Sequence, residues 1–178
     1  MSSKKIVGNI LYSEEDIRKR AKELAHQISK DFDGEELVLI GTLKGSVMWM
    51  CELMKFMEID TSIDFISASS YGSNTVSSGV VKFRMDTESN LYNKNVLVIE
   101  DIVDTGRTLT YVLEKLQERH PKALKVCTML DKPSRRTTDF QADYIGFEVD
   151  DLFIVGYGLD YDQRYRDLPY ISYLQGEE

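Results

Sequence analysis

A short segment in the middle of the chain combines acidic, hydroxyl, glycine and basic residues in an order that suits ligand binding. The segment VLVIEDIVDTGRTL, residues 96–109, passes from an apolar run to two adjacent acids, Glu100 and Asp101, and then to a third acid, Asp104. Helix capping needs only one acidic side chain, so three acids at this spacing exceed a structural requirement. We therefore interpret them as residues that contact a ligand.

The residues that follow the paired acids predict a pocket for a phosphate group. The sequence DTGRT, residues 104–108, is expected to lie between a strand and a helix. Successive main-chain N–H groups at such a place bind a phosphate dianion, and Gly106 lets the main chain come close to it. Thr105 and Thr108 add hydroxyl donors. Carboxylates next to a phosphate would repel it unless they bound another part of the ligand. The carboxylates of Glu100 and Asp101 could accept hydrogen bonds from the hydroxyl groups of a ribose.

Two common nucleotide-binding motifs are absent from the sequence, namely the G-x-x-x-x-G-K-[ST] loop and the G-x-G-x-x-G fingerprint. Instead, the segment resembles the signature of the type I phosphoribosyltransferases, which bind 5-phosphoribosyl 1-diphosphate. The shared features are an apolar strand, paired acids, two apolar residues and then D-T-G-x-T, in that order. The resemblance implies that Glu100 and Asp101 hold the ribose hydroxyls and that the loop from Asp104 through Arg107 to Thr108 holds the 5-phosphate.

Two further segments are similar to the branch of this family that acts on 6-oxopurines. They are LDKPSRR, residues 130–136, and DLFIVGYGLDYDQRYRDLPY, residues 151–170, and the similarity extends from about residue 10 to about residue 174. This branch implies transfer of the phosphoribosyl group to N9 of hypoxanthine or guanine in purine salvage. It assigns Lys132 to the exocyclic oxygen of the purine, Phe153 to stacking on the ring and the Ile154 main chain to the ring edge. Asp104 is the expected general base, taking a proton from purine N7.

The resemblance also assigns a site for the diphosphate group. GTLKGS, residues 41–46, and SSYGS, residues 69–73, fall where the family has its diphosphate loop and its mobile lid. The residues assigned to diphosphate are Leu43, Lys44, Gly45, Ser70, Tyr71 and Arg166. The family has a cis peptide before the lysine of its loop, which leads us to expect one between Leu43 and Lys44. The polar segment at about 70–95 is the expected lid, which would exclude water from the activated sugar.

A magnesium ion is the cofactor that the resemblance implies. Mg²⁺ is usually held by one or two carboxylates together with substrate phosphates. We assign its protein ligands to Glu100, Asp101 and Asp160.

The elements needed to position these residues follow from hydrophobic patterning. We expect a helix that starts with a cap at Ser13 and ends before Gly34, because apolar residues recur at helical spacing between them. Further helices are expected at 47–57 and 107–120, and strands at 36–41, 61–69, 78–85, 96–100, 123–130, 143–148 and 151–158. Alternation of helices with apolar strands predicts an α/β fold with a mainly parallel sheet flanked by helices. The resemblance adds a small hood and the lid, within a single domain spanning 1–178.

Composition limits the kinds of partner. Of 178 residues, 30 are acidic and 22 basic, giving a net charge of -8, which argues against binding to nucleic acid or anionic membranes. Cys51 and Cys127 lie in apolar runs and are expected to be buried free thiols. Neither a signal peptide nor a membrane-spanning run is evident, so we expect a cytoplasmic protein. The resemblance implies a homodimer or homotetramer, and the apolar helix at 47–57 would suit a subunit interface as well as a core.

Two alternatives stay open at this point. One is a regulatory protein on the same fold that binds the sugar diphosphate as a signal and recognises nucleic acid. The other is a phosphoribosyltransferase for a different base, such as xanthine or a pyrimidine, although LDKPSRR argues against a pyrimidine. The sequence leaves the preference among hypoxanthine, guanine and xanthine undecided.

Overall fold

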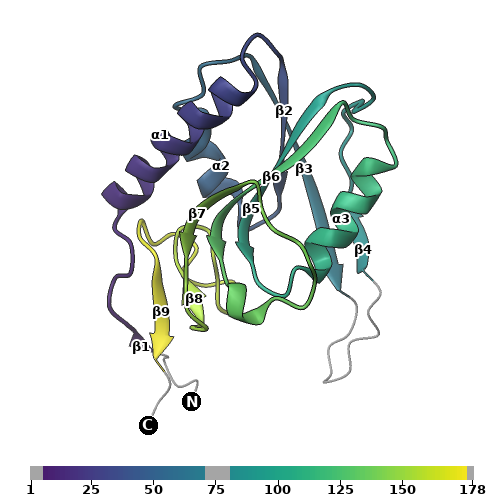
Figure 1. Cartoon of the computed structure of the whole chain (residues 1–178). Helices are drawn as coiled ribbons and strands as arrows, with labels where there is room; N and C mark the ends of the chain where they lie inside the picture. Colours follow the sequence, from purple (N-terminus) through teal and green to yellow (C-terminus); the bar gives the residue numbers. More distant parts are fainter. Residues whose placement is uncertain (1–5, 71–80, 176–178) are drawn as a thin grey trace.

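The computed structural model describes residues 6–70 and 81–175, which form two sheets with helices packed against the larger one (Figure 1). In chain order the elements are β1 (Ile6–Val7), α1 (Glu14–Asp31), β2 (Leu37–Thr42), α2 (Val47–Met54), β3 (Thr61–Ser70), β4 (Val81–Met85), β5 (Asn95–Val103), α3 (Arg107–Gln117), β6 (Ala123–Asp131), a 3-10 turn (Pro133–Arg135), β7 (Tyr144–Glu148), β8 (Ile154–Val155) and β9 (Ser172–Gln175).

The larger sheet has the strand order β4-β3-β2-β5-β6-β7. All neighbouring pairs are parallel except β3 and β4, which are antiparallel. In β5, Leu97 and Ile99 pack with α1 and α2 on one face of the sheet, whereas Val96 and Val98 pack with α3 on the other. Alternate residues of one strand are therefore buried on opposite faces, which is why the strand is an unbroken apolar run. The predicted α/β fold, with a mainly parallel sheet flanked by helices, is confirmed.

The smaller sheet is antiparallel, with the order β1-β9-β8, and it joins the two ends of the described chain. Figure 1 shows it beside the end of the main sheet where the parallel strands have their carboxyl ends. It is the small hood that the resemblance implied, and it places the segment after β8 next to the candidate ligand residues.

Helix α1 begins at the predicted cap. The Ser13 side chain accepts a hydrogen bond from the main-chain N–H of Asp16, and the Asp16 carboxylate accepts one from the main-chain N–H of Ser13. This reciprocal pair satisfies two N–H groups that the helix leaves unpaired. The helix ends at Asp31, and Gly34 follows with φ +75°, a conformation that favours glycine. In the described part of the chain, no helix has the length and apolar character needed to cross a membrane.

Several predicted boundaries were wrong. Strand β5 does not end at the paired acids but continues to Val103, because Ile102 and Val103 pair with Leu130 and Asp131 of β6. Helices α2 and α3 end three residues earlier than expected, at Met54 and Gln117, respectively.

The strand predicted at 151–158 was also mostly wrong. It contains only Ile154 and Val155, since Gly156, Tyr157 and Gly158 all have positive φ and turn the chain away from the extended conformation. The prediction of two buried thiols holds for Cys127, whereas Cys51 lies on the exposed side of α2. Both cysteines are free.

Candidate active site

The predicted ligand residues gather between the carboxyl ends of β2 and β5. The chain leaves β2 for α2 on one face of the sheet and leaves β5 for α3 on the other. Ligands bind to open parallel sheets at such a switch point, because the two connections diverge and leave a crevice. The Thr42 hydroxyl at the end of β2 donates a 2.7 Å hydrogen bond to Glu100 Oε1 on β5. The two strand ends are thus held together at the crevice.

The paired acids stand on β5 itself and are partly buried. Burial raises the pKa of Glu100 well above its ordinary value, and the charge of the adjacent Asp101 adds to this rise. Burial also raises the pKa of Asp101, although the Ile102 main-chain N–H, 2.7 Å from its Oδ1, acts in the opposite direction. Two crowded carboxylates of this kind are stabilised in their ionised form by hydroxyl donors or a cation. The pair therefore suits a sugar diol and a metal ion.

Two glycines allow two loops to pack closely against Asp101 on β5. A Cβ atom on Gly45 would overlap the Asp101 carboxylate, and one on Gly158, where φ is +99°, would overlap the carbonyl oxygen of Gly45. Only glycine therefore fits at either position without displacement of its neighbours. The peptide between Leu43 and Lys44 is cis, as the loop motif implied.

A cleft of about 210 Å³ lies against this junction. Its lining residues are Thr42, Leu43, Lys44, Gly45, Ile66, Ala68, Glu100, Asp101, Thr108, Val112, Asp160 and Arg166. Arg166 Nη2 lies 2.8 Å from Asp160 Oδ1, and its Nη1 donates to the Gly158 carbonyl at 2.7 Å. Lys44 Nζ donates to Gln163 Oε1 at 3.2 Å. The cleft thus combines carboxylates with two basic side chains, which is the donor and acceptor set needed for a metal–diphosphate group.

The predicted phosphate loop leads into an uncapped helix N-terminus. Gly106 is the N-cap residue of α3, with φ +83°, and it has no side chain to cap the helix. The Arg107 main-chain N–H donates to the Thr105 hydroxyl at 3.4 Å, and among the described residues no side chain hydrogen-bonds the next N–H groups, those of Thr108 and Leu109. These N–H groups and the partial positive charge of the helix end are available to an anion. The segment after β6 holds the loop in place, because the Thr137 main-chain N–H donates to the Thr105 carbonyl at 3.0 Å. The Arg107 Nε donates to the Thr137 hydroxyl at 3.2 Å.

A second cleft, of about 510 Å³, adjoins the first. Its lining residues are Ile102, Asp104, Lys132, Arg135, Asp151, Leu152, Phe153, Ile154, Leu159 and Asp160. Lys132 is buried, and its Nζ donates to the Leu152 carbonyl at 2.5 Å. Phe153 is 53% exposed, with its ring 5.4 Å from that of Tyr161 in an edge-to-face arrangement. An aromatic face, a buried ammonium group and a carboxylate therefore line one cleft, and Asp160 is common to both clefts.

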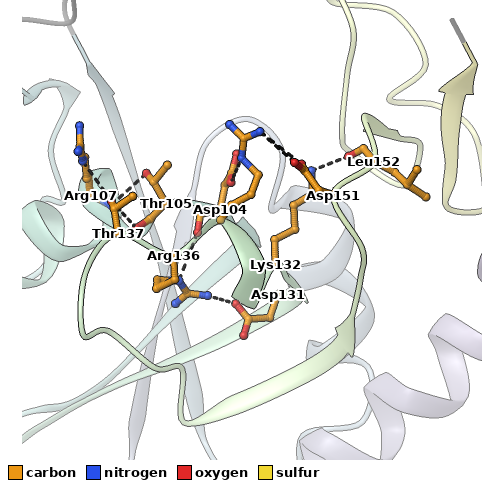
Figure 2. A network of polar contacts seen from close by, with 10 residues as sticks. Asp104, Thr105, Arg107, Asp131, Lys132, Arg136, Thr137, Asp151 and Leu152 are labelled. Carbon is orange, nitrogen blue, oxygen red and sulfur yellow. Dashed lines mark hydrogen bonds and ion pairs between the residues drawn. The ribbon is translucent and has the colours of Figure 1, made fainter.

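Figure 2 shows the polar contacts that connect the phosphate loop with the segment after β6. Arg136 donates through Nε to the Asp104 carbonyl at 3.2 Å, through Nη1 to the Phe140 carbonyl at 2.7 Å, and through Nη2 to the Asp131 carboxylate. Its side chain is only 13% exposed. A buried, planar guanidinium group with three acceptors holds the main chain at Asp104 in a fixed place.

The structure brings together nearly all of the residues predicted to form the site. Those that line one or both clefts are Leu43, Lys44, Gly45, Glu100, Asp101, Asp104, Thr108, Lys132, Phe153, Ile154, Asp160 and Arg166. The other predicted phosphate-binding residues adjoin these clefts in sequence: Thr105 and Gly106 belong to the loop, and Arg107 is the first residue of α3. Ser70 is the last residue of β3, and residues 71–80 of the lid predicted at about 70–95, including Tyr71, lie outside the described residues. The rest of that prediction was too long, because Val81–Met85 form β4 and Leu91 is buried in the core. Within the described part of the chain, no three His, Cys, Asp or Glu residues are close enough to hold a metal without a ligand.

Sequence reasoning missed several residues that shape the two clefts. Thr42, Arg135, Arg136, Asp151 and Gln163 had no assigned role, yet each contacts a predicted site residue or lines a cleft. The available signal was the pair of arginines that closes LDKPSRR, directly after a buried strand.

A larger groove, of about 800 Å³, lies between α3 and the segment 138–143. It is lined mainly by apolar and acidic side chains and contains none of the predicted site residues. Size alone therefore does not locate the site in this molecule.

Comparison with known proteins supports the family. A model of the phosphoribosyl transferase domain matches residues 8–162. The hypoxanthine-guanine phosphoribosyltransferase of Streptococcus thermophilus is 45% identical over 173 residues, which covers 97% of this chain and 96% of the relative. The protein of the same name from Staphylococcus aureus is 48% identical over 168 residues, covering 94% of each chain. A crystal structure of a hypoxanthine-guanine phosphoribosyltransferase from Bacillus anthracis superimposes with a TM-score of 0.91 at 48% identity, covering 94% of this chain and 99% of that one.

Proposed function

The chain belongs to the phosphoribosyl transferase family, and on that basis we propose that it acts as a hypoxanthine-guanine phosphoribosyltransferase in purine salvage. In this reaction the bond between C1′ of the sugar and the diphosphate oxygen breaks, and a bond forms between C1′ and N9 of the purine. The products are a nucleoside monophosphate, diphosphate and one proton from the ring. The observation that carries the proposal is the pair of adjoining clefts that share Asp160, with the paired acids in one and Asp104 and Lys132 in the other.

The smaller cleft and the neighbouring loop would bind 5-phosphoribosyl 1-diphosphate. Glu100 and Asp101 accept hydrogen bonds from the ribose hydroxyls, and the N–H groups at the start of α3 receive the 5-phosphate. Lys44 and Arg166, which both line this cleft, offset the charge of the diphosphate. Ser70 and Tyr71 are proposed to complete this part of the site.

Magnesium is the proposed cofactor. Glu100, Asp101 and Asp160 would hold it, because carboxylates are its preferred protein ligands and these three line one cleft. Because no three acidic residues of the described part of the chain are close enough to hold an ion together, one or two of these carboxylates would bind it at a time, and substrate phosphates and water would supply the other ligands. When bound, Mg²⁺ would neutralise negative charge on the leaving diphosphate.

The larger cleft would bind the purine base. Lys132 donates to the exocyclic oxygen, Phe153 stacks on the ring, and the Ile154 main chain contacts the ring edge. In the structure Lys132 already donates to the Leu152 carbonyl, which keeps its ammonium group ordered in the cleft. A 6-oxopurine accepts a hydrogen bond at this position and the amino group of adenine does not, so the site favours the oxopurine.

Asp104 is the proposed general base. It lines the proposed purine cleft and begins the proposed phosphate loop, which supports a place for it between the base and the sugar phosphate. As N9 attacks C1′, the ring loses its N7 proton to the Asp104 carboxylate. General base catalysis of this kind contributes about 10²–10⁴-fold to the rate, and positioning of the two substrates supplies much of the remainder.

The test is a product assay with hypoxanthine, guanine and xanthine, each supplied with 5-phosphoribosyl 1-diphosphate and Mg²⁺. We expect a nucleoside monophosphate with at least one of the first two bases, and a loss of turnover of about 10²-fold or more in Asp104→Asn. Near-normal turnover by that variant would overturn the role of Asp104. Absence of product with all three bases would overturn the proposed activity. The proposed homodimer or homotetramer is checked separately by analytical ultracentrifugation, and the proposed cytoplasmic location by cell fractionation.

A further inference from the structure

Arg135 lies beside Asp104, the proposed general base, in the purine cleft. It belongs to the 3-10 turn after β6, three residues beyond Lys132, and its side chain turns back toward the cleft that both residues line. Arg135 Nε lies 2.9 Å from Asp104 Oδ1. On its other side, Arg135 Nη1 lies 3.3 Å from Asp151 Oδ1. Figure 2 shows Asp104, Asp151 and Lys132 gathered at this place from three separate segments of the chain.

This contact makes the two oxygens of Asp104 unequal. Oδ1 is buried and has no geometrically aligned hydrogen bond in the described part of the chain, so its contact with Arg135 is an ion pair. The Asp104 side chain as a whole is nevertheless 44% exposed. The oxygen that remains open to a ligand is therefore Oδ2. A carboxylate held at one oxygen and open at the other is suited to accept a proton in a fixed direction.

The charges around Asp104 show why a cation is needed there. The cleft is lined by three carboxylates, Asp104, Asp151 and Asp160, and by two basic groups, Lys132 and Arg135. Asp160 is paired with Arg166, and Lys132 is engaged with a main-chain carbonyl. Arg135 is thus the lining cation that lies between Asp104 and Asp151, and the charges of these two acids raise the pKa of its guanidinium group.

A purely structural role explains this arrangement poorly. The Arg135 and Asp104 side chains are 46% and 44% exposed, respectively, and ion pairs this exposed contribute little to stability. Arg136 already fixes the main chain at Asp104 through its carbonyl, as described above. What Arg135 adds is control of the side chain, namely the direction in which the carboxylate points.

We propose that Arg135 is a positioning residue that holds Asp104 Oδ1, so that Oδ2 faces the purine and accepts its N7 proton. This inference rests on the proposed function and goes beyond it by assigning a role to a residue outside the proposed substrate-binding set. It predicts a defect confined to the purine half of the reaction, because Arg135 does not line the diphosphate cleft.

The experiment compares steady-state constants for Arg135→Ala, Arg135→Lys, Asp104→Asn and the double variant Arg135→Ala/Asp104→Asn. For Arg135→Ala we expect kcat/KM for hypoxanthine to fall about tenfold, a part of the general-base contribution. KM for 5-phosphoribosyl 1-diphosphate should stay within about twofold of the wild type, and the thermal midpoint should be unchanged. Arg135→Lys keeps the charge without the planar fork, and it should restore part of the loss.

The double variant separates positioning from direct contact with the base. If Arg135 acts through Asp104, its removal costs nothing further once Asp104 is Asn. An equal additional loss in the Asp104→Asn background would show that Arg135 contacts the purine itself and would overturn the inference. Wild-type constants in Arg135→Ala would also overturn it.

Arg119→Ala is the matched control, since Arg119 forms a partly exposed ion pair with Asp86, at 2.6 Å, and neither residue lines either cleft. This control should retain wild-type constants. An inactive wild type would refute the proposed function instead, so the two failures are distinguishable.

Discussion

The Gly45→Ala variant tests how closely the diphosphate loop must approach the paired acids. The added Cβ would lie 2.5 Å from Asp101 Cγ. Non-bonded carbon atoms prefer a separation of about 3.5–4.0 Å, so either the loop or the Asp101 carboxylate must move by about 1 Å. A misplacement of this size costs about 10²-fold in rate. We therefore expect kcat/KM for 5-phosphoribosyl 1-diphosphate to fall about 100-fold and the free energy of unfolding to fall by about 1–3 kcal/mol.

The assay measures initial rates over a range of 5-phosphoribosyl 1-diphosphate concentrations at saturating hypoxanthine, together with urea unfolding followed by circular dichroism. Gly146→Ala is the matched control, because a Cβ at Gly146 would overlap the Met129 carbonyl in the sheet, away from both clefts. It should lose stability while keeping its substrate constants. If Gly45→Ala retained the wild-type constants, the packing of this loop against Asp101 would not matter for binding, and the reasoning would be refuted.

The remaining predictions concern acid stability, base discrimination and the core. Although burial opposes ionisation, hydrogen bonds from Ser89 and Thr87 lower the pKa of Asp64 to about 2, below its ordinary 3.8. Because the folded-state pKa is lowered, the stabilisation is present above about pH 4 and is lost as the pH falls toward 2. Asp64→Asn should therefore cost about 1 kcal/mol at pH 7, after allowance for solvent screening, and this cost should shrink in unfolding measured at pH 3; a constant cost would contradict it. Lys132→Gln should lower the preference for hypoxanthine over adenine by about 100-fold or more in a competition assay, and an unchanged preference would remove Lys132 from recognition. Leu97→Ala, in the fully buried part of β5, should lower the free energy of unfolding by about 2–5 kcal/mol without changing KM, and an unaltered urea midpoint would contradict the assigned core.

The sequence was sufficient to predict those parts of the site that depend on residue type and local spacing. Glu100, Asp101 and the loop to Thr108 are contiguous, so their place at a strand end and helix start follows from the apolar run before them and the amphipathic run after them. The parallel sheet was predictable for the same reason, since buried strands and amphipathic helices alternate along the chain.

The parts that could not be predicted depend on how distant segments meet. The contact between Gly45 and Asp101 joins the β2 loop to β5, and nothing in either segment alone indicates it. The direction of the Arg135 side chain depends on the turn after β6 and on Asp151, which precedes β8. The length of β8 was overestimated because the apolar sequence continues beyond Val155 into residues with positive φ. These residues cannot continue an extended strand, although their hydrophobicity resembles that of one.

The central claim is that the acid pair on β5 and the uncapped start of α3 together bind a phosphorylated sugar diphosphate. Isothermal titration calorimetry with 5-phosphoribosyl 1-diphosphate and Mg²⁺ tests it most directly, using the wild type and the Glu100→Gln/Asp101→Asn variant. We expect the wild type to bind the ligand and the variant, which keeps the shape of the site but loses both charges, to bind it at least about tenfold more weakly. Equal affinity of the two proteins, or no binding by folded wild type, would contradict the claim.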